Sequence, residues 1–226
     1  MKLSSRLQAC CGFISPGDRV ADIGTDHGYL GIWLLENGIA ASVIAADIVP
    51  GPLSAARRNA RKYGCADKMD FYLSDGVQSI PHDFDAMVCA GMGADTIISI
   101  LSAAPWLKDS RYKLILQCQS KTPALRQYLS GNGWHIQAET IVRDGRFLYT
   151  VMEVIFSPGH VLTPGQCYFP SVLQNASHAA EYYQRVITSL RRAIAGQKDQ
   201  ADPVMVAALQ ELDSDPTLLL LKEDLQ

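Results

Sequence analysis

Residues Val20 to Leu30 read Val-Ala-Asp-Ile-Gly-Thr-Asp-His-Gly-Tyr-Leu, and this stretch decides the fold. A short apolar run ends at Gly24, and Gly28 follows four residues later. Apolar residues at helical spacing then resume from Leu30 to Leu35. Glycine suits such a turn because the backbone can approach a ligand closely and adopt a positive φ, which a Cβ would penalise. The stretch therefore predicts a buried strand, a tight turn and a helix start whose free N–H groups face a ligand.

The spacing of acidic residues and glycines narrows the choice of ligand. A dinucleotide-binding turn has the pattern G-x-G-x-x-G, which surrounds a pyrophosphate. Here Asp22 lies inside the strand, and Asp26 stands where a further glycine could have stood. The pattern resembles the first motif of class I methyltransferases, whose cofactor is S-adenosylmethionine. Carboxylates can be tolerated beside that cofactor because it carries a sulfonium and an α-amino group. A plain strand-to-helix turn is the alternative interpretation.

Two further strand ends carry candidate cofactor ligands. The apolar run 42–46 ends in Asp47 and Ile48, roughly 20 residues past the glycine turn, where this architecture binds ribose hydroxyls. A carboxylate can accept hydrogen bonds from both hydroxyls, although capping of the next helix is an alternative role for Asp47. The run 69–73 is followed by Ser74, Asp75 and Gly76. Asp75 is a candidate acceptor for the adenine amino group of the cofactor, and its alternative is a turn aspartate.

The fourth predicted strand indicates the kind of acceptor atom. The run 84–90 ends in Gly91-Met92-Gly93-Ala94, and a helix is expected from Asp95 onward. Because parallel sheets bind ligands at the carboxyl ends of their strands, this corner should face the transfer site. Many methyltransferases of amino groups carry an Asn/Asp-Pro-Pro-aromatic motif here, and this sequence has none. The absence favours a ring nitrogen or another acceptor.

The remaining elements complete a domain over residues 1–157. A short amphipathic helix is expected within 1–14, covering one side of the domain; a role for Lys2 and Arg6 in substrate binding is the less favoured alternative. A strand over 113–117, a helix over 122–130 and an antiparallel pair over 134–140 and 148–156 follow, the pair joined by residues 143–146. The pattern predicts an α/β fold: a Rossmann-like, seven-stranded class I methyltransferase sheet.

A second region is expected over residues 158–226, after the boundary at 157–159. Apolar residues from Ala176 to Ile194 recur at three- and four-residue steps, and Asp202-Pro203 starts a second helix with Val206, Leu209 and Leu212. These features predict a C-terminal helical hairpin of coiled-coil type. The seam is too short for a free-standing coiled coil, so we expect it to pack on the main domain or on a partner.

Composition and charge limit the classes of protein to which the chain can belong. The 226 residues carry a net charge of −3, with 15 basic and 15 acidic side chains in 1–159 and 5 and 8 in 160–226. No apolar run reaches the roughly 20 residues needed to cross a bilayer, and the N-terminal order is not that of a signal peptide. Six cysteines without a C-x-x-C pair predict buried thiols, a reducing compartment and a cytoplasmic location. No His, Cys or Asp spacing predicts a metal site.

Taken together, the motifs resemble the bacterial tRNA (adenine-N1)-methyltransferase family often called TrmK, over essentially the whole chain. The resemblance implies methylation of the adenine at tRNA position 22, S-adenosylmethionine as cofactor with S-adenosylhomocysteine as product, tRNA as partner, and a C-terminal coiled-coil domain. Two departures, Gly31 for a usual proline and Ala94 for a common glycine, affect turn geometry. The residues that carry the resemblance are Asp22 to Leu30, Asp47 with Gly51-Pro52-Leu53, Ser74-Asp75-Gly76, Gly91-Met92-Gly93 and Leu114 to Gln117.

Adenine N1 has a free lone pair, so its methylation requires alignment, exclusion of water and stabilisation of positive charge rather than deprotonation. Asp26 is the predicted catalytic residue: it could accept from the adenine N6 amino group, and its alternative is to fix the loop. His27 and Tyr29 are candidates to shape the cofactor or base pocket, although one of them could equally be a packed wall residue. The residues predicted to bind cofactor are Asp22, Gly24, Thr25, His27, Gly28, Asp47, Ile48, Ser74, Asp75, Gly76, Gly91 and Met92.

Access to a stacked adenine requires extrusion of the nucleotide. Arg57, Arg58, Arg143 and Arg146, with the helical hairpin, are candidates to contact RNA phosphates, although the basic cluster at 57–62 is more simply a solvated helix face. A monomer or weak dimer is expected. Two other functions stay open: a small-molecule methyltransferase, and a non-catalytic RNA-binding module that retains the cofactor fold.

Overall fold

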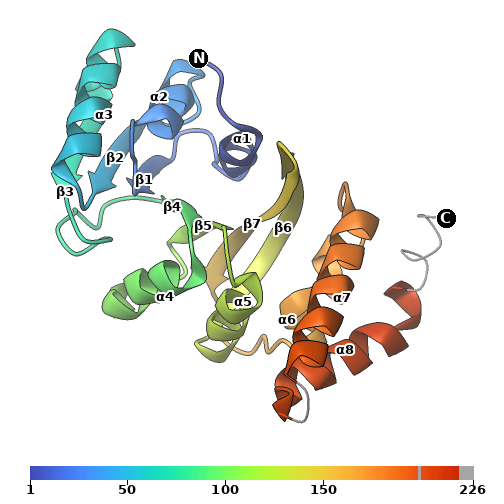
Figure 1. Cartoon of the computed structure of the whole chain (residues 1–226). Coiled ribbons are helices and arrows are strands. Elements are labelled where there is room, and N and C mark those ends of the chain that lie inside the picture. Colours follow the sequence, from blue (N-terminus) through green and yellow to red (C-terminus); the bar gives the residue numbers. More distant parts are fainter. Residues whose placement is uncertain (198–199, 219–226) are drawn as a thin grey trace.

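A seven-stranded sheet forms the centre of the computed structural model, which describes residues 1–197 and 200–218 (Figure 1). The strand order is β3-β2-β1-β4-β5-β7-β6. The first five strands in this order are parallel, and β7 runs antiparallel to both β5 and β6. This order confirms the predicted Rossmann-like sheet. The strands are β1 (Arg19–Ile23), β2 (Ser42–Asp47), β3 (Met69–Leu73), β4 (Ala86–Met92), β5 (Lys113–Cys118), β6 (Trp134–Asp144) and β7 (Phe147–Phe156).

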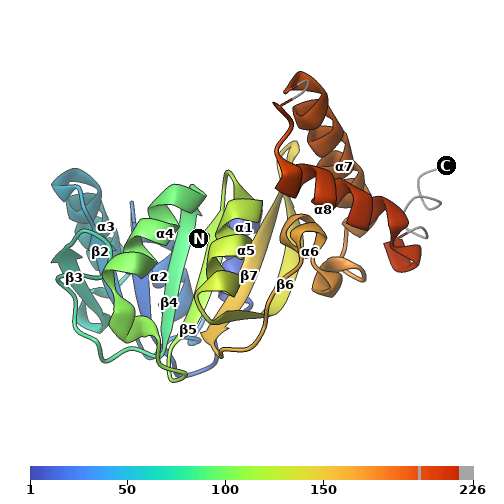
Figure 2. The same ribbon diagram turned by 90° about the horizontal axis from the view of Figure 1, so that it is seen from below.

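Helices cover both faces of the sheet (Figure 2). One face packs against α1 (Ser5–Cys11), α2 (Tyr29–Glu36) and α3 (Pro50–Lys62), and the other against α4 (Ala94–Ala103) and α5 (Thr122–Gly131). Successive strand residues point to opposite faces, so Val20 packs with the first group of helices and Ala21 with the second. Short 3₁₀ turns occur at η1 (Ala66–Lys68), η2 (Pro105–Leu107) and η3 (Ser171–Leu173).

Two element boundaries differ from the sequence prediction. Helix α1 is shorter than the expected 1–14, because Ser4 caps it and it ends at Cys11. The β6–β7 hairpin is longer than expected: its strands reach Asp144 and Phe147, so the connection is two residues rather than four. Gly145, with φ of +60°, allows this tight turn. The longer hairpin places side chains of β7 beside the carboxyl end of β5.

The C-terminal helices α6 (Pro164–Tyr168), α7 (Ala179–Gly196) and α8 (Pro203–Ser214) lie beyond the β6 edge (Figure 2). Their apolar cluster includes Ile141 of β6, so the helices pack on the sheet, as expected. Asp202 caps α8, and the expected seam is confirmed at Leu212, but Ala208 is buried where Val206 was predicted. The coiled-coil character and the division at residue 157 stay predictions.

A buried ion pair attaches the C-terminal helices to the sheet. Arg126 of α5 donates from Nη2 to Glu139 Oε1 of β6 at 2.6 Å, and both side chains are fully buried. Its Nη1 donates to the carbonyl oxygens of Cys167 and Tyr168, at 2.9 and 3.1 Å, where α6 ends. Burial alone would lower the pKa of Arg126, but the Glu139 carboxylate raises it above its ordinary value. The guanidinium thus remains charged and joins three elements.

The expected buried thiols are confirmed. All six cysteines are buried and free of disulfides. Burial raises the pKa of Cys11 and of Cys89 to about 12, so both stay protonated near neutral pH. Among the described residues, no cluster of His, Cys, Asp or Glu could hold a metal ion. No described helix is both long and apolar enough to cross a membrane.

Candidate functional site

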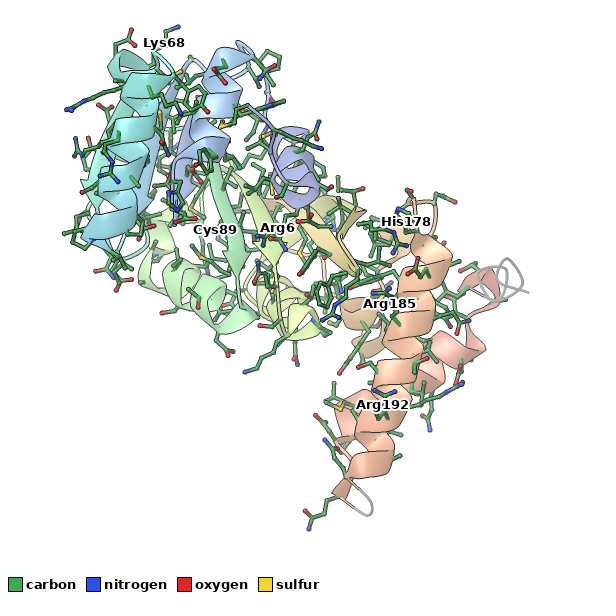
Figure 3. The ribbon with its side chains drawn as sticks, turned by 45° about the horizontal axis from the view of Figure 1, so that its top comes forward. Arg6, Lys68, Cys89, His178, Arg185 and Arg192 are labelled. Atoms are coloured by element: carbon green, nitrogen blue, oxygen red, sulfur yellow. The ribbon has the colours of Figure 1, made fainter. Side chains whose placement is uncertain are left out.

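A cavity of about 320 Å³ lies at the carboxyl ends of β1, β4 and β5, under α1. Figure 3 shows Arg6 of α1 beside these central strands. We call this space the turn cavity, because most of its lining comes from the stretch 22–30, which contains the glycine turn that follows β1. Its lining residues are Arg6, Leu7, Asp22, Gly24, Thr25, Asp26, His27, Tyr29, Leu30, Ala90, Gly91 and Gln119.

The glycine turn is fixed by backbone contacts. The N–H groups of Gly24 and Thr25 both donate to the carbonyl oxygen of Ala46 in β2, at 2.8 and 2.9 Å. Gly24 has φ of +72°, and a Cβ there would lie 2.4 Å from Cε of Met92. Gly28 begins α2 with φ of +73°. The turn therefore requires glycine at Gly24 for both conformation and space.

Asp26 is held by its backbone while its carboxylate stays exposed. Its φ of +52° lies in the left-handed region, which non-glycine residues adopt at a cost of about 1 kcal/mol or more. The Asp26 N–H donates to Oδ2 of Asp47 at 3.2 Å. His27 Nε2 lies 3.5 Å from Asp26 Oδ1, and the His27 ring stacks on Tyr29. The turn therefore presents the exposed carboxylate of Asp26 at the turn cavity, on a backbone held in a strained conformation.

Asp22 is the buried carboxylate of the site. Thr25 Oγ1 donates to Asp22 Oδ2 at 2.7 Å. Burial raises the pKa of Asp22 to about 6, with smaller contributions in the same direction from Asp47 and Asp26, while the Thr25 hydrogen bond opposes the shift. A cation bound in the turn cavity would favour the ionised form of Asp22.

Asp47 joins the ends of three strands. Besides the Asp26 N–H, its carboxylate accepts from the Val49 N–H at 2.9 Å, and its carbonyl oxygen accepts from Ser74 N–H at 3.0 Å. Asp47 does not cap α3, because the helix begins after Val49, so the alternative role in capping is wrong. Ile48 is exposed beside it.

Several predicted ligands lie outside the turn cavity. Among the described residues, the lining of that cavity does not include Asp47, Ile48, Ser74, Asp75 or Gly76. They lie along the neighbouring ends of β2 and β3, where Asp75 is exposed and Ser74 is buried. The predicted site therefore divides into a cavity at β1 and β4 and an open shelf at β2 and β3.

The end of β4 departs from the prediction. The strand was expected to end at Ala90, but it continues to Met92 through a bulge opposite β5. The buried side chain of Gln117 holds this bulge, because its Oε1 accepts from the Gly91 N–H at 3.0 Å. Gly91 has φ of +81° and faces the Arg6 guanidinium and the Gln119 amide. The bulge thus directs Gly91 into the turn cavity.

Comparison with known proteins now decides the family. Residues 3–152 match a family model described as a methyltransferase domain, which covers most of the chain. The chain belongs to this methyltransferase family.

Two kinds of relatives support the assignment. A Bacillus subtilis tRNA (adenine(22)-N(1))-methyltransferase is 33% identical over 153 residues, which are 67% of this chain and 64% of that relative. The match thus spans less than two thirds of the relative's length. The crystal structure of the B. subtilis m1A22 tRNA methyltransferase TrmK has a TM-score of 0.79 at 27% identity, covering 100% of this chain and 99% of that one. A Streptococcus pneumoniae protein crystallised with S-adenosyl-L-methionine has a TM-score of 0.81 at 27% identity, over 94% and 98%.

Arg6 and Gln119 also line the turn cavity, although the sequence interpretation disfavoured the first and omitted the second. Arg6 Nε lies 3.2 Å from Asp144 Oδ2, and its guanidinium carbon is 6.0 Å from the Tyr149 ring centroid. Gln119 directly follows β5, and the rule that ligands bind at strand ends could have identified it. No local pattern marked Arg6, because its position depends on the packing of α1.

The predicted phosphate contacts fall into two groups. Arg57 and Arg58 are exposed on α3, as a solvated or RNA-facing surface requires. Arg143, by contrast, forms an ion pair with Glu181 of α7, which also accepts from Arg185 Nη2 at 2.8 Å. The side-chain hydrogen bond from Arg143 is the main cause that lowers the pKa of Glu181, and the charges of Arg143 and Arg185 lower it further. Arg143 therefore contributes to the packing of α7 on the hairpin.

Proposed function

We propose that this methyltransferase transfers the methyl group of S-adenosylmethionine to N1 of the adenine at position 22 of tRNA. The observation that carries the proposal is the structural likeness to B. subtilis TrmK, which extends over the whole chain, including the C-terminal helices. A small-molecule methyltransferase would need only the sheet domain, so likeness in α6 to α8 favours a macromolecular substrate.

The site residues fit the cofactor. A Cβ at Gly24 would lie only 2.4 Å from Cε of Met92, so the turn fits glycine alone, and a neighbouring ammonium group would favour the ionised form of buried Asp22. On the open shelf, Asp47 and Asp75 would accept from ribose hydroxyls and from the adenine amino group. The proposed binding residues are Asp22, Gly24, Thr25, His27, Gly28, Asp47, Ile48, Ser74, Asp75, Gly76, Gly91 and Met92.

The chemistry needs few protein groups. When bound, S-adenosylmethionine supplies an electrophilic methyl group: the N1 lone pair forms the new N–C bond, the S–C electron pair stays on sulfur, and S-adenosylhomocysteine remains. Asp26 would accept from the adenine N6 amino group and stabilise the positive charge that develops on the ring. Its exposed carboxylate at the turn cavity supports this role.

The tRNA would approach from the exposed end of the sheet. The target nucleotide must leave its stack to enter a pocket of this kind. Arg57, Arg58 and Arg146 would contact phosphates, and binding should weaken as salt rises. A monomer or weak dimer and a cytoplasmic location, expected from the sequence, are part of the proposal.

Transfer of radiolabelled methyl from S-adenosylmethionine to unmodified tRNA, followed by nucleoside analysis, tests the proposal. We expect N1-methyladenosine as the labelled product. Cofactor binding without labelled tRNA would contradict the proposal and favour a small-molecule enzyme or an RNA-binding module. Absence of cofactor binding would overturn the interpretation of the glycine turn as well.

A further inference from the structure

A second cavity, of about 230 Å³, lies between the end of β5, the start of β7 and α7. We call it the hairpin cavity, because most of its aromatic lining comes from the β6–β7 hairpin. Gln119 lines both this cavity and the turn cavity, so this residue borders both spaces. The lining residues of the hairpin cavity are Cys118, Gln119, Thr122, Phe147, Leu148, Tyr149, Thr150, Tyr182 and Arg185.

Aromatic side chains form part of its wall. Phe147 is 48% exposed although it is a large apolar residue, and its ring centroid lies 6.1 Å from that of Tyr149. The Arg146 guanidinium carbon lies 4.9 Å from the Phe147 ring centroid. Single nucleobases that leave their stack are commonly bound on aromatic and arginine side chains of this kind. The wall therefore suits a planar base.

Two polar groups of the hairpin cavity have no hydrogen-bond partner among the described residues. The Thr150 side chain is only 2% exposed, and its hydroxyl has no hydrogen-bond partner in the described part of the chain. Gln119 is exposed, and its carboxamide makes no hydrogen bond to another described residue, so it is open to a ligand. Buried polar groups in native proteins are nearly always paired, so a ligand that reaches Thr150 would supply what the protein does not.

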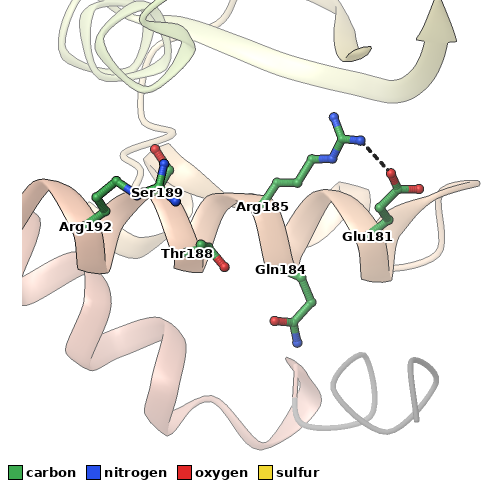
Figure 4. A pocket seen from close by; sticks show the side chains of 6 residues that line it. All are labelled: Glu181, Gln184, Arg185, Thr188, Ser189 and Arg192. Atoms are coloured by element: carbon green, nitrogen blue, oxygen red, sulfur yellow. Dashed lines mark hydrogen bonds and ion pairs between the residues drawn. The ribbon is translucent and has the colours of Figure 1, made fainter. Parts of the chain in front are cut away.

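The guanidinium of Arg185 is already engaged by other groups of the protein. The guanidinium donates to the carboxylate of Glu181 at 2.8 Å (Figure 4). It also donates to the carbonyl oxygen of Arg146 at 3.3 Å. Arg185 therefore acts as a fixed wall on the α7 side and leaves the recognition of a neutral base to the amide and the hydroxyl.

We propose that the hairpin cavity holds the extruded adenine and that Gln119 is its specificity-determining residue. This inference rests on the proposed function. A glutamine amide pairs with adenine by accepting from N6–H and donating to N7. That pairing uses the N7 edge, so N1 stays free and faces the turn cavity, where the methyl donor is proposed to lie. Asp26, which lines the turn cavity, can then accept the second N6 hydrogen. Thr150 provides a further hydrogen bond to the nucleoside.

The test compares tRNA carrying adenosine or 7-deazaadenosine at position 22, because the analogue lacks only the N7 acceptor. For the natural chain we expect kcat/KM to fall by about tenfold with the analogue. For Gln119→Ala, kcat/KM with adenosine at position 22 should be about tenfold below that of the natural chain. Replacing that adenosine with the analogue should lower kcat/KM of the variant little further. Gln137→Ala, an exposed glutamine on the edge strand β6, should behave as the natural chain does.

A second variant guards against a purely structural explanation. Thr150→Val removes the hydroxyl at nearly constant volume. Because that hydroxyl has no partner in the described structure, thermal stability should not fall, whereas KM for tRNA should rise several-fold.

Three results would contradict the inference: wild-type kcat/KM for Gln119→Ala, an equal loss with the analogue in both proteins, or a loss of stability in Thr150→Val without a change in KM. A natural chain that binds cofactor but methylates neither tRNA would overturn the proposed function itself, and the inference with it.

Discussion

The turn cavity and the hairpin cavity are built in different ways. The turn cavity takes most of its lining from one stretch of nine residues, 22–30, whose turn is fixed by hydrogen bonds to β2. The hairpin cavity brings together Gln119, which follows β5, Phe147 of β7 and Arg185 of α7. The first depends on local chain geometry, and the second on strand order and on the attachment of α7. Substitutions should therefore separate cofactor binding from acceptor binding.

The largest effect is expected at Asp26, the proposed catalytic residue, which lines the turn cavity. Asp26→Asn keeps a residue that tolerates a positive φ but removes the negative charge. We expect kcat to fall by about 10²- to 10³-fold, with little change in cofactor affinity. Single-turnover kinetics and calorimetric titration with S-adenosylmethionine measure the two quantities. Equal losses in both would show that Asp26 only shapes the loop.

Arg126 tests whether the hairpin cavity depends on the C-terminal attachment. Arg126→Ala leaves Glu139 buried without its partner, so the free energy of unfolding should fall by about 3–5 kcal/mol. Urea denaturation measures this change, and the exposed pair partner Arg191 provides the control variant Arg191→Ala, with a much smaller effect. Under conditions where the variant is folded, methyl transfer to tRNA should suffer more than cofactor binding. The reverse order would contradict the division between the cavities.

Gly24 tests the local construction of the turn cavity. Gly24→Ala places a Cβ 2.4 Å from Met92 Cε, and we expect cofactor affinity to fall by about one to two orders of magnitude. Gly38→Ala is the matched control, because Gly38 also has a positive φ but has no atom within 4 Å of the added Cβ. If both variants lose equal affinity, backbone strain rather than space explains the requirement for glycine.

The smallest effect concerns pH. Since the folded pKa of Asp22 is raised from 3.8 to about 6, the folded protein holds more protons than the unfolded chain between these values. The contribution of Asp22 to stability therefore falls as pH rises through that window. A cationic group of the cofactor favours ionised Asp22, so affinity should rise by up to about tenfold between pH 5 and pH 7. Titrations at several pH values should show this rise, and Asp22→Asn should remove it.

Site residues whose positions depend on a strand and the turn that follows it in the chain could be predicted from the sequence. Gly24, Asp26 and Asp47 could be placed because a strand, a turn and a second strand end suffice to define their positions. The extension of β4 to Met92 was missed, because Gly91-Met92-Gly93 has the composition of a turn and the bulge is stabilised by Gln117 of another strand.

Residues brought together by topology could not be predicted in the same way. Thr150 reaches the hairpin cavity only because β7 inserts between β5 and β6. Arg6 reaches the turn cavity only because α1 packs over the strand ends. In α8, Ala208 rather than Val206 is buried, since contacts with α6 and α7 set the rotation of the helix.

Methylation of one defined tRNA transcript and of the same transcript with guanosine at position 22 tests the central claim most directly. Nucleoside analysis by mass spectrometry follows incubation with S-adenosylmethionine. The account predicts N1-methyladenosine in the first transcript and no methylated nucleoside in the second. Equal methylation of both transcripts, or a product other than N1-methyladenosine, would contradict it.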